Sequence, residues 1–175
     1  MITEGQFKII GGGNTLVQYL VNSHTLVSEH LYPEASRADV EKYLNWFQIK
    51  MKPETQRLVR MIVPSKVLGG QPASTEQKQK QRQTIYGDHG LLQVLDQELQ
   101  KTNDFICGNH MTVVDIVLYC EISTILALTL KKDDDLATNN PHINKWYLRM
   151  KAVNGMADLD KELAEIVSKY DLTDK

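Results

Sequence analysis

The reactive side chains of this 175-residue chain are few and widely spaced. Its two cysteines, Cys107 and Cys120, are too far apart for the paired-cysteine spacing of a metal or redox site. The five histidines are scattered, and none stands with cysteines or carboxylates at metal-ligand spacing. We therefore expect two reduced cysteines, one of them filling space in the core, with no metal and no catalytic residue.

A run of glycines, Gly11 to Gly13, has the composition of a phosphate-binding loop. The lysine and hydroxyl residue that complete such a loop do not follow it. The run instead separates a predicted strand at residues 6–10 from a predicted helix that Asn14 can cap. A turn that joins a strand to a helix is therefore the better interpretation.

Thr112 and Asp115 stand three residues apart at the start of a strongly apolar segment, residues 113–130. This spacing predicts a capping box, in which the Thr112 hydroxyl accepts from the Asp115 amide and the carboxylate accepts from the Thr112 amide. Met111 and Ile116 are placed to form a hydrophobic staple. Because the helix is apolar on nearly every side, we expect it at the centre of a helical domain, with a structural role for Asp115.

Apolar residues at helical spacing predict further helices on both sides of this segment. The first long helix begins after Ser36, with a kink or break near Pro53 and an end before Pro64. Another helix spans 75–101, with Gly87 and Gly90 as weak points.

The last part of the chain is expected to form a loop and two amphipathic helices. The loop is 131–140, after which Asn140 caps a helix that has Pro141 at its first position. The final helix is expected to bury a stripe of apolar side chains, namely Leu159, Leu163, Ile166 and Val167.

The composition excludes several classes of partner. Hydrophobic residues make up 42% and charged residues 24% of the chain, with a net charge of -2. This balance gives no reason to expect binding to nucleic acid. No apolar run approaches the roughly 20 residues of a membrane span, and no targeting signal is recognisable at the N-terminus. We expect no membrane insertion and a cytoplasmic location.

The order of motifs from Tyr32 to about Tyr170 resembles the all-helical C-terminal domain of glutathione transferases. YPEASRADVEKYLNWF resembles the first helix of that domain, and FICGNHMTVVDIVLYCEI resembles the stretch that caps its central helix. PHINKWYLRM, followed by Asn-Gly, resembles the next helix, and MIVPSKVLGGQPAS is most similar to theta-class members. The resemblance implies an all-α bundle over residues 31–175.

Residues 1–30 resemble the end of the thioredoxin-like domain that holds glutathione in that family. EGQFKII is similar to its fourth strand and GGGNTLVQYL to its third helix, which implies a strand–helix remnant. An acidic residue and a hydroxyl residue at the start of that helix grip glutathione in the family. Here Gly12 and Gly13 align with them, and Asn14 and Thr15 follow, which implies a degenerate glutathione anchor.

Three interpretations follow from the resemblance. In the first, which we favour, the chain is a non-catalytic assembly module without a cofactor. Its partners are other protein subunits, in a homodimer or in a pairing with another glutathione-transferase-like domain. In the second, it is a theta-like transferase that conjugates glutathione to electrophiles, with the missing site supplied by another subunit. In the third, upstream sequence supplies that site.

Two segments are candidates for the interface of such an assembly. The predicted strand has no neighbour to pair with in the expected remnant, so we expect it to pair with another chain or to pack flat on the helical domain. Its residues are Gln6, Phe7, Lys8, Ile9 and Ile10. Trp46 is the second candidate, equally compatible with a core position, whereas Tyr43 and Phe47 are expected in the core.

Overall fold

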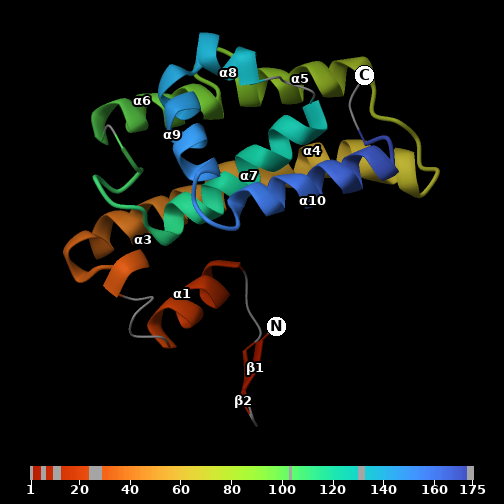
Figure 1. Cartoon of the computed structure of the whole chain (residues 1–175). Coiled ribbons are helices and arrows are strands. Elements are labelled where there is room, and N and C mark those ends of the chain that lie inside the picture. The colour runs from red at the N-terminus through yellow and green to blue at the C-terminus, as the bar shows by residue number, and fades with distance from the viewer. Residues whose placement is uncertain are drawn as a thin grey trace.

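Helices account for most of the computed structural model, and they pack around one buried helix, α7 (Val113–Thr129). The structure describes residues 2–4, 7–9, 13–23, 29–102, 104–129 and 133–172. In Figure 1, α4 (Lys52–Val67) and α10 (Met156–Lys169) run beside α7. This arrangement confirms the predicted all-α helical bundle.

The N-terminal residues form a hairpin rather than a single strand. Strand β1 (Ile2–Glu4) pairs in antiparallel fashion with β2 (Phe7–Ile9), with Ile2 opposite Ile9. The expectation that this strand lacks a neighbour is therefore wrong, because the residues before it fold back and pair with its backbone. Of the predicted interface segment, Gln6 and Ile10 lie outside the described residues.

The next helix, α1 (Gly13–Ser23), starts two residues earlier than predicted, since an N-cap at Asn14 would make Thr15 its first residue. Asn14 consequently lies inside the first turn instead of at the N-cap. Figure 1 shows the hairpin and α1 at one end of the bundle.

A π-helical turn marks the interruption that was predicted near Pro53. After η1 (Glu34–Ser36), α3 (Arg37–Trp46) leads into the turn η2 (Phe47–Met51) and then into α4. Proline has no N–H and its ring crowds the carbonyl four residues earlier, so a wider turn just before it relieves the clash. The predicted end before Pro64 is wrong, since α4 continues to Val67.

The predicted helix at 75–101 is divided in two, α5 (Thr75–Tyr86) and α6 (Leu91–Thr102). The break occurs at the glycines identified as weak points. A Cβ atom at Gly90 would lie 2.7 Å from the carbonyl oxygen of Gly87, so this tight connection requires glycine. Ser74 and Gln77 form a capping box at the start of α5, and the Ser-x-x-Gln spacing in the sequence is the local signal for this helix start.

Two short helices, α8 and α9, precede α10 in the sequence. The expected loop at 131–140 is partly wrong, because α8 (Asp133–Asn139) is helical and buries Leu136. The next helix is α9 (Pro141–Lys151), which is amphipathic as predicted and buries one apolar stripe. The stripe is fully covered and consists of Ile143, Trp146, Tyr147 and Met150.

The stripe predicted for α10 is only partly correct. Val167 is buried, as expected, and Met156 joins it in the core. Leu159 and Ile166 are 44% and 50% exposed, respectively. The apolar side of α10 is thus wider than the surface that the bundle covers.

None of the helices in the described part of the chain is long and apolar enough to cross a membrane.

Candidate functional site

Asp115 is the most heavily bonded polar side chain in the core. It is fully buried at the start of α7, and its Oδ2 accepts from the Thr112 amide at 2.8 Å. Its Oδ1 accepts from the Ile106 amide at 3.0 Å and from the Trp146 indole N–H at 2.9 Å. One carboxylate therefore joins the turn before α7, the start of α7 and the middle of α9. This geometry gives Asp115 a structural role, as predicted.

The Thr112 hydroxyl behaves differently from our prediction. It donates to Oδ2 of Asp115 at 3.0 Å, while the Asp115 amide bonds to the carbonyl oxygen of Thr112. An ionised carboxylate is the stronger acceptor, so it attracts the hydroxyl proton. Met111 and Ile116 are both half-buried against the core. Their direct contact remains a prediction.

The cap of α9 comes from another helix. Oδ1 of Asp96, on α6, accepts from the amides of His142 and Ile143 at 2.8 and 2.9 Å. Asn140, which we expected to cap α9, makes no such side-chain bond. A carboxylate satisfies two free N–H groups and also complements the helix dipole. Asp96 and His142 are 46 residues apart in the sequence, so no local pattern predicts this cap.

A second carboxylate, Asp160 of α10, connects α10 to α7 and α9. It accepts from the hydroxyl groups of Tyr119 at 2.7 Å and Ser123 at 2.9 Å. The Tyr119 and Tyr147 rings stack beside it, with centroids 4.9 Å apart. Burial, followed by the bond to Asp160, raises the pKa of Tyr119, so its hydroxyl is a stable donor.

A groove with a mostly apolar lining lies between α3 and α6. Its volume is about 350 Å³. We call it the α3–α6 groove. It is lined by Lys42, Tyr43 and Trp46 from α3, and by Val94, Leu95, Glu98 and Lys101 from α6. Trp46 is half-buried there, whereas Tyr43 and Phe47 are in the core, as predicted for those two residues.

Charged groups surround the apolar floor of this groove. The Tyr43 hydroxyl donates to Glu98 at 2.7 Å, and Lys101 also donates to that carboxylate. The bonds from Lys101 and then Tyr43 lower the pKa of Glu98, whereas burial and Glu98 raise the pKa of Tyr43. Lys42 lies over the Tyr43 ring at 4.4 Å. The groove offers an apolar surface with two cations at its edge and no activated nucleophile.

The predicted glutathione anchor is only partly described. Gly13 starts α1, and Thr15 is exposed in its first turn. Gly12 and the side chain of Asn14 lie outside the described residues. The first turn of α1 contains no acidic residue.

Neither cysteine has the environment of a reactive thiol. Cys107 is half-buried beside Thr112, and burial raises its pKa to about 12. Cys120 is exposed on α7, so the expectation of a core-filling cysteine there is wrong: that face of the helix points to solvent. In the described part of the chain no group of cysteines, histidines and carboxylates has the arrangement of a metal site.

Comparison with known proteins agrees with this architecture. Residues 51–153, from the end of the π-helical turn to just after α9, match the model of the glutathione S-transferase C-terminal domain. The chain belongs to the glutathione S-transferase family. The matched residues include the α7 capping box, the Asp96 cap and the α6 side of the α3–α6 groove.

Theta-class relatives cover almost the whole chain. It is 25% identical over 170 residues to mouse glutathione S-transferase theta-3, a match that spans 96% of this chain and 66% of the relative. Mouse glutathione S-transferase theta-1 is 27% identical over 169 residues, spanning 92% and 67%. This glutathione-transferase-like chain therefore spans about two thirds of the length of these relatives.

Solved structures share the fold at lower identity. A glutathione S-transferase from Rhodospirillum rubrum superposes with a TM-score of 0.72 at 24% identity, covering 89% of this chain and 67% of that one. The human T1-1 enzyme, as a W234R mutant, gives 0.68 at 22% identity, covering 96% and 67%. These similarities establish the fold.

Proposed function

We propose that this glutathione-transferase-like chain is a non-catalytic assembly module, joined to another protein subunit through the α3–α6 groove. The observation that carries the proposal is the start of α1, where glycines occupy the positions that align with the family's glutathione anchor and no acidic residue is present. In the described first turn of α1 there is therefore no carboxylate to pair with the α-amino group of glutathione.

The α3–α6 groove is suited to protein contact. Trp46 and Val94 give it an apolar centre, and Lys42 and Lys101 give it a charged edge, the distribution typical of an interface hot spot. The partner we propose is a second glutathione-transferase-like domain that inserts an apolar side chain between α3 and α6. Under this proposal, a charged residue at position 46 prevents assembly without unfolding the bundle.

The alternative is a theta-like transferase that conjugates glutathione to electrophiles. Similarity to theta-class enzymes along almost the whole chain favours it. In that case, the helical domain would contribute part of the binding surface and another polypeptide segment would activate the glutathione thiol.

Calorimetric titration of glutathione into the purified chain, with turnover of a generic electrophile measured in parallel, separates the two functions. The assembly proposal predicts no binding heat and no turnover. Millimolar or tighter binding with turnover would overturn it. The variant Trp46→Glu, compared with Ile49→Glu on the exposed face of η2, then tests whether the groove holds a partner.

A further inference from the structure

A second groove, between α4 and α5, is lined mainly by polar side chains. Its volume is about 300 Å³. We call it the α4–α5 groove. The lining residues, two from α4 and four from α5, are Arg57, Met61, Gln77, Lys80, Gln81 and Thr84. Two of these side chains are cationic and none of them is acidic, so the groove favours an anion.

Helices α4 and α5 have an excess of positive charge that is local to them. They contain four and three basic residues, respectively, and one acidic residue each, in a chain whose net charge is -2. Near the two ends of α4, Lys52 and Lys66 are paired with Glu121 and Asp171. Those two charges are balanced, and the remaining excess lies along the middle of α4 and on α5.

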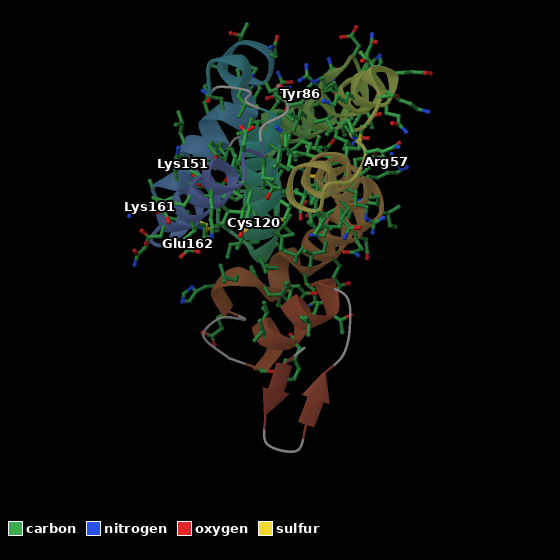
Figure 2. All side chains as sticks on the ribbon, turned by 90° about the vertical axis from the view of Figure 1, so that its right-hand side faces the viewer. Arg57, Tyr86, Cys120, Lys151, Lys161 and Glu162 are labelled. Carbon is green, nitrogen blue, oxygen red and sulfur yellow. The ribbon has the colours of Figure 1, made fainter. Side chains whose placement is uncertain are left out.

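Arg57 is exposed at the outer edge of the bundle, on the side opposite Lys151 and Glu162 (Figure 2). Its Nη1 donates to the Glu54 carboxylate, which also accepts from Nε2 of Gln81 at 3.2 Å. This bond uses only part of the guanidinium, which has five N–H donors in one plane. The other N–H groups of Arg57 can therefore donate to an oxyanion in the groove.

Two glutamines of α5 are held in place by hydrogen bonds. Gln81 is 3% exposed, and its Nε2 donates to the carbonyl oxygen of Glu54 at 2.9 Å, which joins α5 to α4. Oε1 of Gln77 accepts from the Ser74 amide at 2.9 Å in the capping box of α5. Because this bond orients the amide group through its oxygen, the two N–H donors of Gln77 remain for a ligand.

Lys80 is the second cation of the groove. It is exposed on α5 and forms no ion pair with any described residue. One ammonium group on α5 and one guanidinium group on α4 together match the charge of a dianion. A phosphate monoester has a charge of about -1.5 to -2 at neutral pH and three acceptor oxygens.

We propose that the α4–α5 groove binds a small molecule through a phosphate monoester group. The phosphate lies between Arg57 and Lys80 and accepts from the side-chain amide of Gln77. Met61, the apolar side chain of the lining, packs against the rest of the molecule.

The size and charge of the groove favour a small ligand over a polymer. Its volume is at the lower end of the range of small-molecule pockets, which starts near about 300 Å³. A nucleic acid is held by many cations along its backbone, whereas here Lys52 and Lys66 are already paired. The groove shares no lining residue with the α3–α6 groove, so this site goes beyond the assembly function and either proposal can fail alone.

An NMR titration of the whole chain tests the proposal, with phenyl phosphate and inorganic phosphate as probes at constant ionic strength. We expect saturable shifts of the backbone amide signals of residues 54–61 and 77–84, together with the side-chain amide signals of Gln77. Phenyl phosphate should bind more tightly than inorganic phosphate, because its ring contacts Met61.

Two arginine variants separate a specific site from general attraction. Arg57→Gln and Arg60→Gln each remove one positive charge from an exposed position of α4, but Arg60 lines a different cavity, between α4 and α7. Arg57→Gln should weaken the binding of phenyl phosphate at least about tenfold, through loss of a hydrogen bond to a charged group. Arg60→Gln should weaken it by about threefold at most, because only a screened long-range charge is lost.

The variant Gln77→Glu tests the donor without removing the helix cap. Glutamate at the third position of a capping box still accepts from the Ser74 amide, so α5 keeps its start. The N–H donors are replaced by a carboxylate, which repels phosphate. We expect no detectable binding of phenyl phosphate, with a urea midpoint close to that of the wild type. Circular dichroism checks that every variant keeps its helices.

Several outcomes overturn the inference. They are an absence of saturable shifts at the highest soluble concentration, equal losses in Arg57→Gln and Arg60→Gln, and a Gln77→Glu variant that binds like the wild type. Equal affinity for the two probes would assign the groove to the free phosphate ion. A single-stranded oligonucleotide that binds the chain and displaces phenyl phosphate would assign it to a polyanion. Both results reject a small phosphate monoester as the ligand.

Discussion

The indole N–H of Trp146 donates to Oδ1 of Asp115 at 2.9 Å, and both side chains are in the core. The bond joins the start of α7 to the middle of α9, two helices between which the short helix α8 lies in the sequence. The same oxygen accepts from the amide of Ile106. The capping box of α7 is therefore also a tertiary junction.

Loss of the hydrogen bonds to Asp115 should lower the free energy of unfolding. Asp115→Ala leaves the Trp146 indole, the Ile106 amide and the Thr112 amide without their acceptor in a dry environment. We expect a loss of about 3–5 kcal/mol in the free energy of unfolding, measured by urea denaturation. Asp158→Ala, at an exposed carboxylate in the first turn of α10, should cost less than about 1 kcal/mol. Similar losses for the two variants would contradict the junction.

The cap of α9 gives a second, smaller prediction. Asp96→Ala removes the acceptor for the amides of His142 and Ile143, so we expect a loss of about 1–2 kcal/mol. Asn140→Ala should cost less, because the Asn140 side chain makes no capping bond. The reverse order in urea denaturation would show that α9 is capped locally.

Because of Glu98 in the α3–α6 groove, we expect the free energy of unfolding to depend on pH in the acid range. The bonds from Lys101 and Tyr43 lower the pKa of Glu98 in the folded state, so the native protein holds the ionised form more firmly than the unfolded chain does. This contribution is present above the ordinary glutamate pKa and is lost as the pH falls through the lower, folded value. Urea midpoints measured downward from neutral pH should decline less steeply in Glu98→Gln than in the wild type. Parallel curves would contradict this role of Glu98.

The two cysteines should differ in reactivity. Cys120 is exposed on α7, while Cys107 is half-buried with a pKa of about 12. At mildly alkaline pH, a maleimide should therefore label Cys120 first in the native protein. In Cys120→Ala only the slow phase should remain, and urea should make it fast. A fast phase that persists in that variant would show that the Cys107 thiol is more accessible than its burial indicates.

Local patterns in the sequence predicted most of the helices and much of the core, although α8 was expected as a loop and α5 and α6 as one helix. The apolar run after Thr112 predicted α7, and Asn-Pro predicted the start of α9, because a helix start depends on residues within one turn. The buried stripe of α9 followed from its 3.6-residue period. The family resemblance, based on the order of these signals, agreed with the match to the glutathione S-transferase C-terminal domain.

Tertiary structure decided which partners these local elements use. The Asp96 cap and the bond from Trp146 to Asp115 join residues far apart in the sequence, and no period encodes such contacts. The exposure of Leu159 and Ile166 on the predicted stripe of α10 has the same origin. Periodicity defines an apolar face, whereas packing against α7 and α9 decides how much of that face is covered. The sequence by itself thus determined most of the helices and their apolar sides, and only the folded bundle decided which parts of those sides are covered.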